Sequence, residues 1–206
     1  AARHGAFSAA MAAESQAIEH FPNSPVLHRN MIALSEGDIE RIESARLACP
    51  TDGEIWLADL MSRIRAGQKK DAIGPFVAKA LRDGDFPAPI WVRAGDLCLR
   101  NDMVDIASEI ATRAVAEANG LLSAYALALQ CALQKDDTVL ASEMARKGVD
   151  NAFDPTVFYK AIVWIKTTGV EEDGDMISAL EYLRNEFPKD TEWAEHLSHV
   201  FFQKGD

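Results

Sequence analysis

The sequence predicts an all-α protein made of about twelve short helices in series, and three observations lead to this prediction. Few segments alternate with period two, and Val, Ile and Thr are scattered instead of clustering into short strands. Apolar residues recur instead at the spacing of one helix face. Glycine and proline interrupt the chain at short intervals and leave segments of roughly 10–16 residues between them.

Each expected helix lies between such breakers. Proline lacks the backbone N–H that a helix interior uses, and glycine costs about 1 kcal/mol there relative to alanine. The breakers are Pro22, Pro25, Gly37, Pro50, Gly53, Gly67, Gly84, Pro87, Pro89, Gly120, Gly148, Pro155, Gly169, Gly174 and Pro188. We therefore expect helices at residues 6–20, 25–35, 38–48, 54–66, 69–83, 88–100, 103–118, 122–134, 137–148, 156–168, 175–187 and 191–203.

The apolar spacing is clearest in two of these segments. Segment 54–66 places on one side of its helix Ile55, Trp56, Leu60, Met61 and Ile64. Segment 103–118 does the same with Val104, Ile106, Ala107, Ile110, Ala111, Ala114 and Val115. In segment 69–83, Pro75 removes one helical hydrogen bond, which costs about 3 kcal/mol if nothing compensates. We expect a kink there, or a helix that begins near Gly74 and Pro75.

An internal repeat accounts for this series of helices. Large aromatic residues recur at sequence intervals of 35, 34, 33 and 35, at Trp56, Trp91, Tyr125, Phe158 and Trp193. Ala72, Ala107 and Ala141 follow the first three at one fixed interval of sixteen, and Ala179 follows Phe158 at a longer one. Two helices of a hairpin approach closely only where side chains are short, and an aromatic ring from a neighbouring helix can fill the adjoining space. We expect the aromatic residues to be core residues.

This pattern resembles the tetratricopeptide repeat, a helix–turn–helix unit of about 34 residues with the pattern W-x2-L-G-x2-Y, then A-x3-F, A and P. The unit near residue 88 matches best, through Trp91, Ala94, Gly95, Cys98, Ala107, Ala111 and Ala114. Its neighbours match through Trp56, Leu60, Ala72 and Phe76, through Tyr125, Ala128, Ala141, Ala145 and Gly148, and through Phe158, Ile162, Ala179, Leu183 and Pro188. The family's glycine position is filled only at Gly95.

The resemblance covers nearly the whole chain and implies one domain over residues 1–206, a right-handed superhelix of stacked antiparallel hairpins. The expected hairpins lie at residues 25–50, 53–86, 88–120, 122–150 and 155–188. Helix 6–20, with Ala10, Ala17 and Pro22, resembles a second helix without its first. Helix 191–203 resembles a first helix without its second. These unpaired ends, and a start at Ala1 instead of Met, indicate a fragment of a longer array.

Composition narrows the class of partner. The 21 basic and 32 acidic residues give a net charge of −11, which argues against binding nucleic acid or a membrane surface. Residues 1–103 carry 12 basic and 14 acidic side chains, and residues 104–206 carry 9 and 18. No apolar stretch reaches the roughly 20 residues of a membrane span. Cys49, Cys98 and Cys131 fit either a reducing compartment or simply three buried small side chains. A cytoplasmic location is favoured, with a periplasmic one open if a targeting segment was removed.

Motifs for catalysis or cofactors are not evident, and we expect neither an enzyme nor a cofactor. His196 and His199 lie close together on one helix and could touch one metal ion, but a solvated pair is favoured because a structural zinc site needs four ligands. The acidic run at residues 171–175 suggests calcium, yet its register would put Gly169 at the first ligand position. We interpret it as a solvated turn whose Asp175 caps the next helix.

The resemblance also implies a concave wall lined by first helices, which binds extended or helical peptides. The wall positions are Leu57, Met61, Ile64, Arg65, Val92, Asp96, Leu99, Arg100, Ala126, Gln130, Leu133 and Gln134, followed by Tyr159, Val163, Lys166 and Thr167 in the fourth unit. Apolar positions beside Arg65 and Arg100 suit a peptide with apolar anchors and an acidic group. The alternative is that the arginines pair with nearby acids, Asp96 for one of them. No Asn lies in the wall, so the family's clamp for a peptide C-terminus is not supported.

Three functions are compatible with this architecture. The leading one is a non-enzymatic scaffold that binds a protein or peptide partner, with self-association through the unpaired terminal helices as a further option. The second is a regulatory or tethering repeat domain of a larger enzyme or envelope-assembly protein. The third, a nucleic-acid reader similar to pentatricopeptide proteins, is disfavoured by the acidic charge.

Overall fold

A computed structural model of the chain describes residues 2–35, 38–117, 120–168 and 174–204. The described residues form helices and connecting turns, with no strand among them, which confirms the all-α prediction. The helices are α1 Ala2–His20, α2 Pro25–Leu34, α3 Ile39–Ala48, α4 Gly53–Arg65, α5 Lys70–Asp83, α6 Ala88–Leu99, α7 Val104–Glu117, α8 Leu122–Gln134, α9 Thr138–Asn151, α10 Thr156–Thr168, α11 Gly174–Glu186 and α12 Thr191–Lys204.

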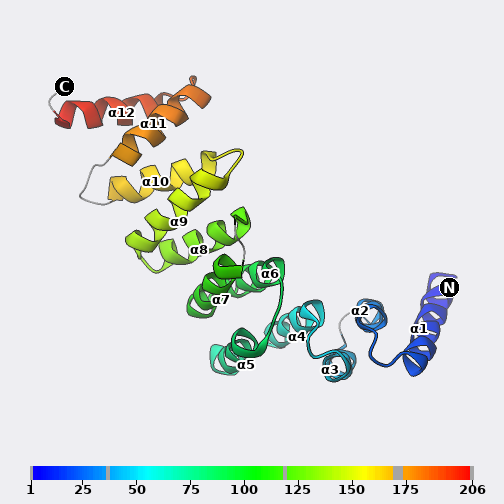
Figure 1. The fold of residues 1–206 in the computed structure, drawn as a ribbon. Helices are drawn as coiled ribbons and strands as arrows, with labels where there is room; N and C mark the ends of the chain where they lie inside the picture. Colours follow the sequence, from blue (N-terminus) through cyan, green and yellow to red (C-terminus); the bar gives the residue numbers. More distant parts are fainter. Residues whose placement is uncertain (1, 36–37, 118–119, 169–173, 205–206) are drawn as a thin grey trace. The chain divides into compact units, whose positions relative to one another are not determined.

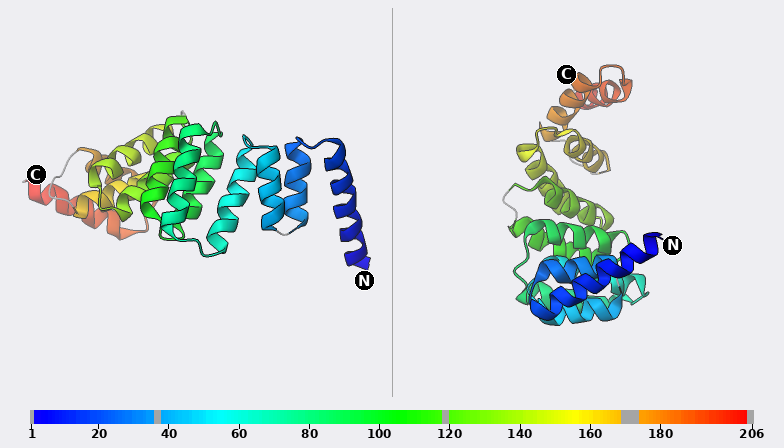
Figure 2. Two further views of the ribbon diagram at one scale, coloured as in Figure 1. Left: turned by 90° about the horizontal axis from the view of Figure 1, so that it is seen from below. Right: turned by 90° about the vertical axis from the view of Figure 1, so that its right-hand side faces the viewer.

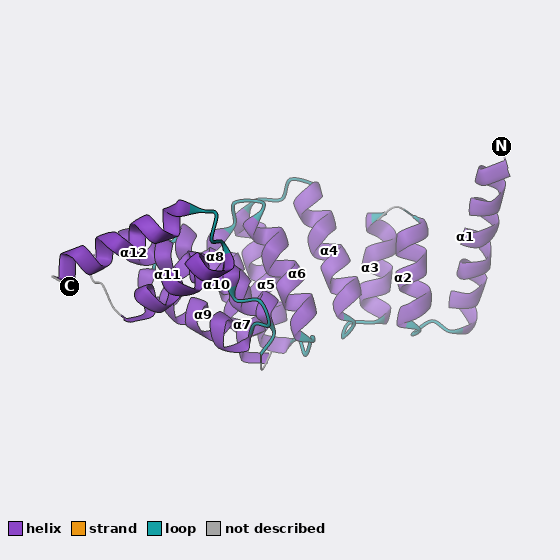
Figure 3. Cartoon of the chain, turned by 90° about the horizontal axis from the view of Figure 1, so that it is seen from above, coloured by secondary structure: helices purple, strands orange, loops and turns teal. Residues whose placement is uncertain are grey.

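The chain divides into two compact units, Ala1–Arg113 and Ala114–Asp206 (Figure 1). In unit 1, each helix from α1 to α4 packs against the next one, and the first helices of the hairpins also pack in a row, α2 on α4 and α4 on α6. Figures 2 and 3 show α2, α3 and α4 running side by side. In unit 2, α8 to α12 pack in chain order. Packing between sequential helices is the contact pattern of a helical solenoid.

The turns repeat with the same period as the aromatic residues. Gly67, Asp102 and Asp136 follow α4, α6 and α8, and each has a positive φ, of 74°, 57° and 55°. Their spacing along the chain is that of the first three periodic aromatic residues. Glycine adopts this left-handed backbone without strain, and aspartate is one of the few other residues that tolerates it. Each of these hairpins therefore turns through the same local geometry.

The five periodic aromatic residues are all buried, as predicted: Trp56, Trp91, Tyr125, Phe158 and Trp193. In unit 1 the rings form a cluster. The centroids of Trp56 and Trp91 lie 5.3 Å apart, edge to face, and Phe86 lies 5.2 Å from each of them. Phe76 stacks on Trp56 at 5.9 Å with an angle of 7° between the ring planes. Such ring pairs add about 0.5–1.5 kcal/mol beyond the area they bury.

The prediction of small residues at the helix contacts is correct at three positions and wrong at one. Ala107, Ala141 and Ala179 are fully buried. Ala72 is exposed, and its neighbour Ile73 occupies the core position instead. One residue corresponds to about 100° around a helix, so a shift of one position moves the side chain from the core to solvent. The period of the repeat did not reveal this local shift.

Helix α1 begins at Ala2, before the expected start at residue 6, and two further details differ from the prediction. Helix α9 continues past Gly148 to Asn151, and a Cβ atom on Gly148 would overlap the ring of Phe158. This glycine permits a close approach of α9 and α10 and does not end the helix. Helix α5 begins at Lys70 and contains Pro75, so the alternative of a start near Gly74 is wrong.

Candidate functional site

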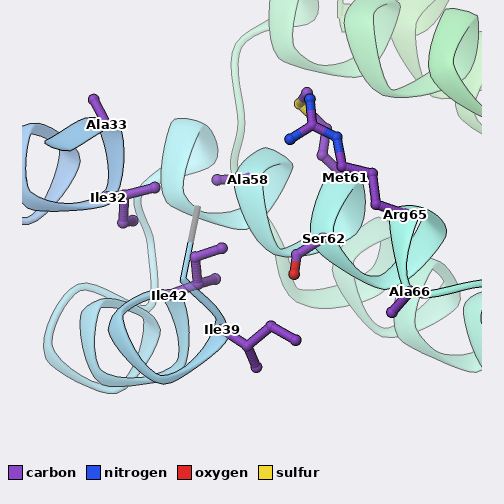
Figure 4. A pocket seen from close by; sticks show the side chains of 9 residues that line it. All are labelled: Ile32, Ala33, Ile39, Ile42, Ala58, Met61, Ser62, Arg65 and Ala66. Atoms are coloured by element: carbon purple, nitrogen blue, oxygen red, sulfur yellow. The ribbon is translucent and has the colours of Figure 1, made fainter. Parts of the chain in front are cut away.

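An apolar groove in unit 1 lies between α2, α3 and α4 (Figure 4). Its volume is about 460 Å³, and it is lined by Ile32, Ala33, Ile39, Ile42, Ala58, Met61, Ser62, Arg65 and Ala66. The groove forms because α4 turns small side chains, Ala58 and Ser62, toward the isoleucines of the two preceding helices. An apolar hollow with a single cationic side chain among its lining residues is suited to an apolar anchor beside an acid.

Two of the predicted wall residues line this groove. Met61 and Arg65 lie one turn apart on α4 and therefore share one face of the helix. Leu57, one turn before Met61, is only 3% exposed and packs in the core. Ile64 is half-buried and lines a separate hollow of about 510 Å³ at the turns after α4 and α6. The first helix of this unit thus presents Met61 and Arg65, and Leu57 offers little surface to a partner.

Arg65 and Arg100 have different surroundings, although the repeat gives them equivalent positions. Arg100 donates a hydrogen bond from Nε to Asp96 Oδ1 at 3.1 Å, and in the same ion pair its Nη2 lies 2.9 Å from Oδ2. Arg65 is exposed, and among the residues that the structure describes it has no hydrogen bond or ion pair. Pairing with Asp96, the alternative for one arginine, therefore holds for Arg100.

The other wall positions vary in exposure. Leu99 is buried, and Val92 and Asp96 are half-buried. In unit 2, Gln130 is exposed, whereas Ala126 and Leu133 are half-buried. The rings of Tyr159 and Tyr182 pack with their centroids 4.5 Å apart and their planes tilted by 32°, and Val163 is buried. The side chains of Lys166 and Thr167 lie outside the described residues.

A buried ion cluster in unit 1 was not predicted. Asp59 on α4 is 4% exposed. Its carboxylate accepts hydrogen bonds from Arg46 Nη1 at 2.7 Å and from Arg63 Nε at 2.8 Å. The sequence did contain a signal, because Asp59 lies beside Leu60 and nearly one turn after Trp56, on the apolar side of α4. An acid on a buried helix face needs a partner.

The sequence also suggests two possible metal sites, a histidine pair and an acidic run near the C-terminus. Within the described residues, no group of three or more His, Cys, Asp or Glu is placed to hold a metal ion. His196 Nε2 lies 3.9 Å from Glu192 Oε1, and the side chain of His199 is outside the described part. The acidic run at residues 171–173 lies outside it too. Helix α11 begins at Gly174, so Asp175 lies within the helix and does not cap it.

The three cysteines are buried and form no disulfide. Burial raises the pKa of the Cys131 thiol to about 11, although Lys135 lowers it slightly. Burial also raises the pKa of Cys49, with a further increase from the charge of Asp52 that Arg29 opposes. A thiol reacts as its thiolate, so Cys49 and Cys131 are packing residues with low reactivity at neutral pH. No helix in the described part is long and apolar enough to cross a membrane.

Comparison with known proteins adds evidence on the fold. No family model and no curated protein matches the chain. A solved structure of PilF from Pseudomonas aeruginosa is similar over 96% of this chain and 91% of that one, with a TM-score of 0.53 and 12% sequence identity. A human IFIT1 dimer with PPP-AAAA is similar over 96% of this chain and 45% of that one, with a TM-score of 0.45 and 15% identity.

PilF is a tetratricopeptide repeat protein. At 12% identity, the similarity to PilF concerns the fold alone. It agrees with the sequential packing of the helices, the buried aromatic period and the repeated turn geometry. The chain is a helical repeat protein with the tetratricopeptide-like fold.

Proposed function

We propose that this protein is a non-enzymatic scaffold that binds a protein partner, and that the groove between α2, α3 and α4 receives a peptide segment of that partner. The segment carries an apolar side chain followed or preceded by a carboxylate. One observation supports this proposal most: Arg65 lines an apolar groove with no acidic partner of its own among the described residues.

The charges in the protein make this arginine selective. The net charge of −11 repels acidic ligands at long range, so binding of an acid depends on contacts within about 8 Å at physiological salt. A guanidinium group donates paired, charge-assisted hydrogen bonds to a carboxylate, which are stronger than neutral ones. The isoleucines that line the groove bury an apolar anchor beside it. Recognition then requires both features in one peptide.

Synthetic peptides test this proposal directly. A panel carries Leu or Phe at varied distances from an Asp or a terminal carboxylate, and a matched panel replaces the acid with its amide. We expect the acidic peptides to bind more tightly, as measured by calorimetry. Arg65→Ala should lower the affinity for the tightest-binding peptide about fivefold or more, which corresponds to about 1 kcal/mol of binding free energy. Equal binding of acid and amide peptides would contradict the proposal.

Two further variants separate charge from shape. Ala58→Phe places a ring in the groove and should block binding while Arg65 stays intact. Arg100→Ala removes an arginine at the equivalent repeat position that is already paired with Asp96, so it should have a smaller effect than Arg65→Ala. Circular dichroism confirms that each variant is folded. A pull-down with the intact protein then identifies natural partners, whose segments enter the same competition assay.

A further inference from the structure

A second cationic site lies on the other side of α4. Positions 63 and 65 are separated by about 200° around a helix, so Arg63 points away from the face that carries Arg65. Arg63 and Arg46 of α3 both donate to Asp59, one to each carboxylate oxygen. One arginine would neutralise this buried acid. Two leave the cluster with an excess of one positive charge.

An aromatic ring holds both guanidinium groups in place. The Cζ atom of Arg63 lies 4.5 Å from the ring centroid of Phe76, and that of Arg46 lies 5.3 Å from it. Phe76 in turn stacks on the buried Trp56. A guanidinium close to an aromatic ring is attracted electrostatically to the ring face. The two arginines are therefore fixed by a buried carboxylate and by a ring that is itself anchored in the core.

Most of their hydrogen-bond donors are unused. An arginine has five N–H donors. Arg46 uses one of them for Asp59, and Arg63 uses one for Asp59 and one for Gln68 Oε1 at 3.5 Å. Among the described residues the other donors have no partner. The side chains of Arg46 and Arg63 are 38% and 27% exposed, so these donors can reach a ligand from solvent.

We propose that Arg46 and Arg63, positioned by Asp59 and Phe76, form a binding site for an oxyanion on a partner protein, either a phosphate or a carboxylate. Both anions accept paired hydrogen bonds from guanidinium groups. Because the arginines are already ordered, binding costs little side-chain entropy. The extra positive charge in an otherwise acidic protein is then satisfied by the ligand. None of these four residues lines the groove between α2, α3 and α4.

The test is a titration of the intact protein with inorganic phosphate and, separately, with acetate. The readout is the side-chain Nε–Hε resonance of each arginine in a heteronuclear NMR spectrum, and sodium chloride at equal ionic strength is the reference. We expect saturable shifts for Arg46 and Arg63 with at least one anion, and no such shifts for Arg93, which pairs with Glu54 in the same unit. Tighter binding of phosphate indicates a phosphorylated partner, and equal or tighter binding of acetate indicates an acidic one.

Variants complete the test. Arg46→Gln and Arg63→Gln should each lower the affinity for the anion at least tenfold, whereas Arg93→Gln should leave that affinity unchanged. Saturable shifts that persist unchanged in both arginine variants would overturn the proposal, as would shifts in the parent protein no larger than those in sodium chloride. The titration of the parent protein decides the question even if a variant fails to fold. Peptide binding to the groove is measured separately with Arg65→Ala. The proposed function can therefore hold or fail independently of this anion site.

Discussion

Gly148 has no Cβ atom, and this allows α9 and α10 to pack closely. Gly148 lies in the interior of α9 and is buried, and the ring of Phe158 occupies the space where its Cβ atom would be. Glycine inside a helix costs about 1 kcal/mol relative to alanine. Overpacking a core costs about 1–3 kcal/mol. Here the overlap involves several atoms of a buried ring, so the packing effect should exceed the gain in helix propensity.

We therefore predict that Gly148→Ala destabilises unit 2 by about 1–2 kcal/mol, measured by chemical denaturation. A double-mutant cycle supplies the control. In a Phe158→Ala background the ring is absent, and the same substitution should be neutral or slightly stabilising. An equal loss of stability in both backgrounds would mean that contact with Phe158 does not explain the glycine.

Ala107 and Ala72 provide a second test at the scale of single residues. Both follow a tryptophan at the same interval, yet Ala107 is fully buried and Ala72 is exposed. Ala107→Leu should overpack a helix contact and cost about 1–3 kcal/mol. Ala72→Leu should change stability by less than about 0.5 kcal/mol, as most surface substitutions do. Thermal unfolding of the two variants decides this, and a similar loss for both would contradict the burial of only one.

At the scale of elements, proline has two different effects in neighbouring helices. Pro75 lies inside α5, where its nitrogen cannot donate to the carbonyl of Asp71. Pro89 lies in the first turn of α6, where the backbone N–H has no helical acceptor in any case. The same residue type is therefore costly in one helix and harmless in the other.

Replacing these prolines measures the difference. Pro75→Ala should stabilise the protein by about 1–2 kcal/mol, because the restored hydrogen bond outweighs the greater freedom that alanine gives the unfolded chain. Pro89→Ala should be neutral or slightly destabilising. Chemical denaturation of both variants provides the comparison, and a destabilised Pro75→Ala protein would show that α5 has adapted to the proline.

The helices were predictable because their signals are local. Breakers bound them, and apolar residues recur at helical spacing within them, so most boundaries agree closely with the structure. The exposure of Ala72 and the cluster around Asp59 depend on neighbours that are distant in sequence. Arg46 comes from the helix before Asp59, and Phe76 comes from the helix after it. Helix packing decides which arginines contact a buried acid. The period of the repeat carries no information about that pairing.

At the scale of the whole molecule, stability should be uneven along the chain. None of the described side chains of α1 from residue 6 onward is buried, whereas α6 buries Ala88, Ile90, Trp91, Ala94, Cys98 and Leu99. Helix α1 is also rich in alanine, so few apolar contacts hold it against α2. Regions with few buried contacts open locally at a lower free energy than the core.

Hydrogen exchange followed by mass spectrometry tests this expectation. Amides of α1 should exchange at least tenfold faster than those of α6 in a protein shown to be monomeric by analytical ultracentrifugation. Slowed exchange in α1 at higher protein concentration would indicate that this helix packs against a second copy. Protection in the monomer equal to that of α6 would contradict the expectation.

The paired tryptophans of unit 1 have an optical consequence. The rings of Trp56 and Trp91 are buried 5.3 Å apart, and among the described residues neither indole Nε1 has a hydrogen-bond partner. An indole in dry surroundings emits at shorter wavelengths than one in water, and two rings this close couple their electronic transitions. Trp164 in unit 2 is 52% exposed and should emit at longer wavelengths. Unit 2 also contains the buried Trp193, so in a Trp193→Phe variant the shift to longer wavelengths on unfolding reports the loss of unit 1 alone, without any added label.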